Sequence, residues 1–139
     1  MGTVHAEVTL KNVADGIRAR DGHIKEMDIR SETVTAVVDT GAMTLTITEE
    51  LCQKLGLTIT AQKIVRTASG QRLSCGLTEA VEIHWKDRSA VERPIVVPGA
   101  PVVLLGVTPL EVMDLVVDPV HLELMGAHDD GWTEWVLTA

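Results

Sequence analysis

The chain has 139 residues, the length of a single ordinary domain with one hydrophobic core. Acidic residues outnumber basic ones by 20 to 12, and Lys and Arg form no cluster, so nucleic-acid binding is not expected. No apolar run approaches the length of a membrane span, and the first residues lack the apolar core of a signal peptide. We therefore expect a soluble, cytoplasmic protein that does not contact a membrane.

The core must be built without most aromatic residues, because Phe and Tyr are absent and Trp occurs three times. Val, Leu, Ile, Ala and Met must fill it instead. The two cysteines, Cys52 and Cys75, form neither a disulfide framework nor a metal-binding motif. We expect both to be reduced, buried thiols.

The first third of the chain indicates strands. Hydrophobic residues alternate with polar ones from position 4 to position 10, as in a half-buried strand. Turn signals at Asp15-Gly16 and Asp21-Gly22 predict short strands near 17–20 and 23–30. A β-branched run over 33–39 and a second over 44–47 predict two more strands.

Two short helices are expected. The first covers 49–55, where Thr48 (or Thr46, with Glu49 closing a capping box) caps its start and Gly56 ends it. The second starts at Thr108-Pro109, with Thr108 as the cap, and ends before Pro119.

The remaining segments favour strands. They cover 59–67, 73–85, 91–97 and 102–105, followed by a tail of strands over 120–139 that carries Trp132 and Trp135. The segment 68–71 between the first two has the composition of a hairpin tip. Many short strands with two brief helices predict an all-β class and a small barrel of mostly antiparallel strands.

The stretch with the clearest chemical meaning is Val37-Val38-Asp39-Thr40-Gly41-Ala42. A carboxylate at the end of an apolar strand is costly to bury unless it is hydrogen-bonded or used. Gly41 allows the backbone to turn sharply and another group to approach closely. Asp39 alone could equally satisfy a strand-end turn, and three residues match by chance often enough.

Two further features follow Asp39 in order. A hairpin tip lies about thirty residues on, at Ser69-Gly70, and Leu104-Leu105-Gly106 precedes a helix. With this ordered set, the chain from about position 34 to position 124 resembles the retropepsin-like aspartic proteases, in particular their small bacterial single-domain members.

The resemblance implies one domain over 1–139 that folds as a closed barrel and forms a homodimer. Its parts would be a catalytic loop at 37–43, a flap at about 64–76, the Leu-Leu-Gly segment with its helix at 103–116, and a C-terminal strand tail at 120–139. Asp39 from each subunit would be the catalytic residue, at a site on the dimer axis.

The resemblance also implies roles for the neighbours of Asp39. Thr40 would hydrogen-bond across the dimer axis, and Gly41 and Ala42 would offer backbone groups to an extended peptide substrate. The flap residues Ala68, Ser69 and Gly70 would close over that substrate. Beneath the catalytic loop would lie the segment Leu104, Leu105 and Gly106.

The chemistry of peptide hydrolysis agrees with a dimer. One group must activate water and another must protonate the leaving amine, and two carboxylates about 3 Å apart do both by sharing one proton. One chain has a single Asp-Thr-Gly and is too short for two such lobes. No metal or organic cofactor is expected, and the polar segment His128-Asp129-Asp130 is interpreted as a solvated turn.

Two departures from the family pattern support other hypotheses. Met43 follows Ala42, where the family often has a small polar or acidic residue, and no charged residue follows Gly106 directly. These departures favour a non-catalytic peptide- or protein-binding module with the same barrel. A third hypothesis is a subunit of a larger assembly whose two-Trp tail docks a partner.

Overall fold

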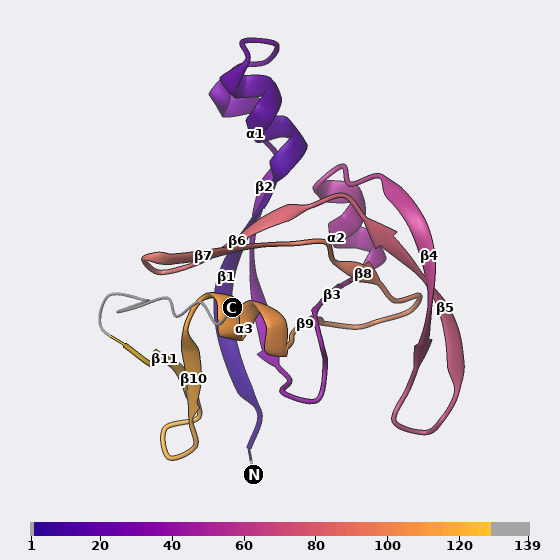
Figure 1. Cartoon of the computed structure of the whole chain (residues 1–139), viewed down its shortest axis with the longest axis vertical. Coiled ribbons are helices and arrows are strands. Elements are labelled where there is room, and N and C mark those ends of the chain that lie inside the picture. Colours follow the sequence, from indigo (N-terminus) through magenta and orange to yellow (C-terminus); the bar gives the residue numbers. More distant parts are fainter. Residues whose placement is uncertain (1, 129–139) are drawn as a thin grey trace, which may run out of the picture.

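The computed structural model describes residues 2–128 (Figure 1). The tail strand expected over 131–139, with Trp132 and Trp135, lies outside these residues, as do Asp129 and Asp130. The elements are, in chain order, β1 (Val4–Asn12), α1 (Val13–Arg20), the 3-10 turn η1 (Glu26–Asp28), β2 (Ser31–Val38), β3 (Leu45–Ile47), α2 (Glu49–Lys54), β4 (Ile59–Arg66), β5 (Arg72–Thr78), β6 (Val81–Trp85), β7 (Arg88–Glu92), β8 (Ile95–Val96), β9 (Val103–Leu105), α3 (Val107–Val112), β10 (Leu115–Asp118) and β11 (Glu123–Gly126).

Nine strands form one curled sheet in the order β4-β5-β8-β3-β9-β2-β1-β6-β7, and β10 and β11 form a second, two-stranded sheet (Figure 1). Among the described strands only the pairs β2–β9 and β3–β8 are parallel. The predicted all-β class with mostly antiparallel pairing is therefore confirmed. The sheet order has two ends, β4 and β7, so the chain forms a curled half-barrel where a closed barrel was predicted.

The core lies where the alternating faces of the strands meet. In β1 every second residue is buried, as its alternation predicts, and its partner β2 runs antiparallel along its whole length. Burial of aliphatic side chains from both strands, from β3 and from α2 supplies the main stabilisation. Among the described hydrophobic residues, those with no exposed surface are Leu10, Ala36, Leu45, Ile47, Leu55, Cys75, Val81, Ile83 and Leu105.

Residues 13–30 differ from the prediction of two short strands. Residues 13–20 form helix α1, because the Asn12 side chain caps its start by accepting the N–H of Asp15 at 3.0 Å. Asp15 then lies in the first turn and Arg18 in the last, where their charges suit the helix dipole. The Asp15-Gly16 pair that was interpreted as a turn is thus inside a helix, and residues 26–28 form the turn η1.

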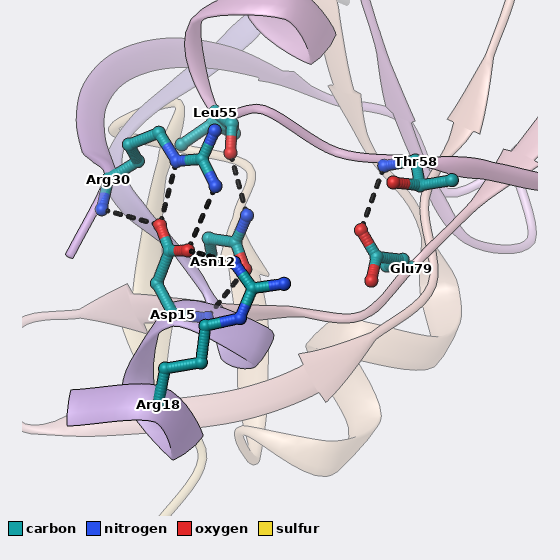
Figure 2. A network of polar contacts seen from close by, with 7 residues as sticks. All are labelled: Asn12, Asp15, Arg18, Arg30, Leu55, Thr58 and Glu79. Carbon is teal, nitrogen blue, oxygen red and sulfur yellow. Dashed lines mark hydrogen bonds and ion pairs between the residues drawn. The ribbon is translucent and has the colours of Figure 1, made fainter. Parts of the chain in front are cut away.

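Asp15 is the centre of a polar network that joins α1 to Asn12 at the end of β1, to Arg30 just before β2 and to Leu55 just after α2 (Figure 2). Its side chain is 2% exposed and accepts hydrogen bonds from Arg30 Nε at 2.8 Å, Arg30 Nη2 at 2.9 Å and the Arg30 backbone N–H at 3.0 Å. Asn12 Nδ2 donates to the Leu55 carbonyl at 2.8 Å, at the end of α2. These contacts lock the helical segment onto the sheet.

Helix α2 is formed as predicted. Thr48 Oγ1 accepts the N–H of Leu51 at 3.1 Å, which identifies Thr48 as the cap. The helical residues end at Lys54, and Gly56 closes the turn that follows with a φ of +63°, which suits a residue without a side chain. A Cβ there would also lie 1.7 Å from Arg30 Nη1, so Gly56 leaves room for the Asp15–Arg30 pair.

Helix α3 begins two residues earlier than predicted, at Val107 instead of Pro109. Gly106 is its cap and makes no side-chain hydrogen bond, so Thr108 is not the cap residue. The first N–H groups of the helix donate instead to backbone carbonyls of the loop between β2 and β3, as described below. The helix also ends earlier, at Val112, where the prediction continued it to 116.

The end of the described chain is held by the buried side chain of Arg88. Arg88 Nη1 donates to the carbonyls of Met113 at 3.2 Å and Asp114 at 2.5 Å, and Gly126 packs against the guanidinium. The predicted strand near 121 begins instead at Glu123, because the Asp118 side chain accepts the N–H groups of Val120 and His121 and bends the chain into a turn. No helix within residues 2–128 is long and apolar enough to cross a membrane.

Candidate active site

The position of the loop from Asp39 to Thr44 is set by strand β9. Strand β9 lies between β2, with which it is parallel, and β3, with which it is antiparallel. The chain must therefore cross over β9 as it passes from β2 to β3. The Asp39 N–H donates to the Leu105 carbonyl at 3.0 Å and extends the β2–β9 ladder by one residue. Asp39 thus stands where the strand ends and the loop begins.

The side chain of Asp39 is held by its own loop. Its Oδ1 accepts the N–H of Gly41 at 2.9 Å, and its carbonyl accepts the N–H of Ala42 at 3.1 Å. Within residues 2–128, Oδ2 has no hydrogen-bond partner. Asp39 is half-buried, so one oxygen is fixed and the other is left for a ligand or a second group.

Leu104-Leu105-Gly106 lies directly under this loop. Gly106 cannot carry a side chain, because a Cβ would lie 2.4 Å from the Thr44 carbonyl oxygen and 2.6 Å from that of Ala42. The next two N–H groups, of Val107 and Thr108, donate to the carbonyls of Ala42 and Met43, both at 2.9 Å. The loop is therefore clamped between β9 and the start of α3.

A groove of about 910 Å³ opens beside Asp39. Its walls come from the Asp39 loop, from the β4–β5 hairpin and from the segment between β8 and β9. Among its lining residues Asp39 is the single carboxylate and Arg66 the single cation. The other lining residues are Gly41, Ala42, Met43, Thr44, Thr46, Ile64, Val65, Thr67, Ala68, Leu73, Ile95, Val97, Ala100, Pro101, Val102 and Leu104.

The β4–β5 hairpin ends in a tight turn at the predicted tip. The N–H of Thr67 donates to the Gln71 carbonyl at 2.8 Å, and the N–H of Gly70 donates to the Thr67 carbonyl at 2.9 Å. Gly70 has a φ of +86°, which a residue without a side chain adopts easily. The hairpin tip and the Asp39 loop point toward the same end of the molecule, opposite to α1 (Figure 1).

The structure brings together some of the predicted site residues and leaves others apart. Asp39, Gly41, Ala42, Ala68 and Leu104 line the groove, whereas Ser69 and Gly70 do not. Leu105 is fully buried and Gly106 is packed against the loop. Thr40 is exposed and makes no hydrogen bond with a described residue. The Met43 side chain, 80% exposed, forms part of the rim.

Sequence reasoning missed the third wall of the groove, at positions 95–102. Two hydrogen bonds hold this segment. The Gly99 N–H donates to Glu49 Oε1 at 3.2 Å, and the Ala100 N–H donates to the Val97 carbonyl at 3.1 Å. The signal in the sequence was Pro98-Gly99-Ala100-Pro101, a turn between two short apolar runs just before Leu104.

Other reactive groups within residues 2–128 do not form a competing site. Cys52 and Cys75 are buried free thiols, and burial raises the pKa of both, which favours their unreactive neutral form. Asp118, His121 and Glu123 lie within 4.8 Å of one another on the surface, but the His121–Asp118 hydrogen bond of 2.7 Å accounts for that proximity. His128 Nδ1 contacts Asp114 at 2.8 Å, and its two acidic neighbours lie outside the described residues.

Comparison with known proteins identifies one matching family. The model of the family described as gag-polyprotein putative aspartyl protease matches residues 25–111, which is more than half of the chain. The match includes the Asp39 loop, the β4–β5 hairpin and Leu104-Leu105-Gly106. No curated protein matches the chain.

Proposed function

The chain belongs to this family of gag-polyprotein aspartyl proteases, and from that membership we propose that it is an aspartic endopeptidase whose catalytic carboxylate is Asp39. The observation that carries the proposal is the position of Asp39. It lines a largely aliphatic groove, with one oxygen held by the Gly41 N–H and the other free of hydrogen bonds within residues 2–128.

The second carboxylate must come from a second chain. Hydrolysis by this chemistry needs a general base and a general acid, and Asp39 is the single acid that lines the groove in the described residues. A homodimer in which the two Asp39 loops meet supplies the pair. Thr40, exposed and without a described partner, is then available to hydrogen-bond across the axis.

In this dimer the two Asp39 carboxylates share one proton, because two like charges so close together do not both ionise. The ionised carboxylate takes a proton from water as the water attacks the scissile carbonyl. The protonated carboxylate gives its proton to the leaving nitrogen. No metal or organic cofactor takes part in these steps.

The substrate of the proposed enzyme is an extended peptide segment. It lies in the groove against the backbone of Gly41 and Ala42, and the β4–β5 hairpin acts as the flap over it. The proposed domain covers residues 1–139, with the catalytic loop at 37–43, the flap at about 64–76 and the Leu-Leu-Gly segment with its helix at 103–116.

Substitution of Asp39 tests the proposal. Asp39→Asn keeps an Oδ1 that accepts the Gly41 N–H but cannot serve as base, so it should abolish cleavage of a mixed peptide library without unfolding the chain. The measurement is cleavage by wild type and variant from acidic to neutral pH, with a maximum expected on the acidic side. Asp87→Asn, at an exposed carboxylate outside the groove, is the matched control and should cleave as wild type does.

The same experiment tests the alternative of a non-catalytic peptide-binding module, which the exposed Met43 side chain at the groove rim favours. A folded, dimeric wild type that cleaves no peptide at any pH would contradict the protease. Peptide binding without cleavage by that wild type would support the binding module.

A further inference from the structure

The β4–β5 hairpin has a charge opposite to that of the rest of the molecule. The chain carries a formal net charge of −8, yet positions 60–78 contain Lys63, Arg66 and Arg72 and no Asp or Glu. An acidic protein thus places an uncompensated positive segment beside its groove. Such local charge attracts anionic ligands.

Two of these cations face each other. Arg66 and Arg72 are direct partners in the β4–β5 ladder, so their side chains lie on the same face of the hairpin, next to its tip. Like charges in directly opposite positions destabilise a strand pair. Both residues are exposed, and neither makes an ion pair with any residue in the described part of the chain.

Three other arginines of the described chain make hydrogen bonds within it. Arg93 Nε donates to the Thr78 carbonyl at 3.1 Å, and Arg30 and Arg88 are bonded to carboxylate and carbonyl oxygens. Stabilisation of the hairpin therefore explains Arg93 but not the Arg66–Arg72 pair, whose repulsion a bound anion would relieve.

One member of the Arg66–Arg72 pair, Arg66, lines the groove, and Arg72 lies opposite it in the ladder, outside the lining. Arg66 lies next to Thr67 and Ala68 in the lining, while most other lining side chains are aliphatic or small. A peptide in the groove can thus bury an apolar side chain and bring a neighbouring side chain to the arginines. Guanidinium groups bind carboxylates with two parallel hydrogen bonds, which makes a Glu or Asp the best match.

We propose that Arg66 and Arg72 determine specificity by binding an acidic side chain that flanks the aliphatic part of the substrate peptide. The inference rests on the proposed function for its substrate, a polypeptide, and adds which polypeptides are preferred. It commits to an acidic peptide rather than a nucleic acid, because the rest of the molecule is acidic and repels a phosphate backbone.

The test measures binding first, so that it does not depend on catalysis. Fluorescein-labelled peptides share the centre Val-Leu-Ala-Val-Leu and carry Glu-Glu, Gln-Gln or Lys-Lys on both sides. Their Kd for the full chain with Asp39→Asn is measured by fluorescence anisotropy at low and moderate salt. We expect the Glu peptide to bind about three- to tenfold more tightly than the Gln peptide, and the difference to shrink with salt.

In the double variant Arg66→Gln/Arg72→Gln, the Glu and Gln peptides should bind with equal Kd values. In Arg66→Glu/Arg72→Glu, the Lys peptide should bind more tightly than the Glu peptide. The matched control Lys11→Gln/Lys25→Gln removes two exposed positive charges outside the groove and should keep the preference for the Glu peptide. Removal of the facing arginines should leave the Tm equal or raise it, whereas a purely structural role for the pair predicts a lower Tm.

Equal Kd values for the Glu and Gln peptides would overturn the inference. It would also be overturned if the Lys11/Lys25 control lost the preference for the Glu peptide as fully as the Arg66/Arg72 variant does. Neither result would bear on the proposed protease activity. A poly-dT oligonucleotide that binds more tightly than the Glu peptide would overturn the inference in favour of nucleic acid. Conversely, a clear preference for the Glu peptide together with no cleavage by wild type would support this inference and contradict the proposed protease.

Discussion

Two aspartates of this chain show how partners decide the role of a residue. Asp15 is almost fully buried, and Arg30 donates three hydrogen bonds to its carboxylate. Asp39 is half-buried, and the loop supplies one hydrogen bond to one of its oxygens. The first arrangement favours the charged form of Asp15 and stabilises the fold, whereas the second leaves one Asp39 oxygen without a hydrogen-bond partner within residues 2–128.

The Asp15–Arg30 pair predicts how stability depends on pH. The side-chain hydrogen bond from Arg30 is the main cause that holds the pKa of Asp15 below its usual range, although burial acts in the opposite direction. Because the pKa is lower in the folded state, the pair stabilises the fold fully above the unfolded pKa of about 3.9. This stabilisation is lost as the pH falls through the folded pKa.

Asp15→Asn should therefore lower the free energy of unfolding at neutral pH by about 1.5–3 kcal/mol, the usual contribution of hydrogen bonds to a charged group. The difference from wild type should shrink in strong acid, where wild-type Asp15 is also neutral. Urea unfolding at both pH values measures this. Asp21→Asn, which removes an exposed partner of Arg20, should lower the free energy of unfolding much less. A loss that is the same at both pH values would contradict the account.

At the scale of elements, the insertion of β9 between β2 and β3 makes the site. It forces the chain to cross over β9 in the Asp39 loop, and Gly106 lets the loop carbonyls approach the start of α3. The clamp is made of backbone groups, so it depends on close approach rather than on any side chain in the loop.

Gly106→Ala tests the clamp. The added Cβ would meet two backbone oxygens that cannot move without displacing the loop, so we expect a loss of about 1–3 kcal/mol in stability and a large loss of peptide cleavage. Gly16→Ala is the control, because nothing lies within 4 Å of its Cβ and alanine favours a helix. That variant should be as stable as wild type or more so; a tolerated Gly106→Ala with full activity would contradict the clamp.

Local patterns predicted most of these elements, and the misses have physical causes. The alternation in β1, the capped helix α2 and the glycine-tipped β4–β5 hairpin depend on neighbours in the sequence, so they could be read from it. Helix α1 was missed because Asp15-Gly16 also suits a turn. The Asn12 cap favours the helix locally, and Arg30, fifteen residues away from Asp15, holds the Asp15 side chain in place.

In the candidate site too, the features that depend on local sequence were predicted and those that depend on distant contacts were not. The ordered set of Asp39, the hairpin tip and Leu104-Leu105-Gly106 pointed to the loop and to what lies under it. The wall at 95–102 and the position of Arg66 depend on the packing of segments far apart in the sequence. The cap of α3 was misassigned for that reason too, because carbonyls of the loop between β2 and β3 accept its first N–H groups.

At the scale of the whole molecule, one chain supplies half of the proposed catalytic apparatus. Its sheet is a half-barrel with ends at β4 and β7, and its groove contains one carboxylate among the described residues. The central claim is therefore that activity belongs to a pair of chains, each contributing one Asp39.

Mixing of subunits tests this claim most directly. Wild type is exchanged with increasing fractions of Asp39→Asn chains at constant total concentration, and peptide cleavage is measured after equilibration. If each site needs two Asp39 residues, activity falls as the square of the wild-type fraction, to about a quarter at equal amounts. Activity that falls in proportion to the wild-type fraction, to about half at equal amounts, would mean that each chain works alone and would contradict the account.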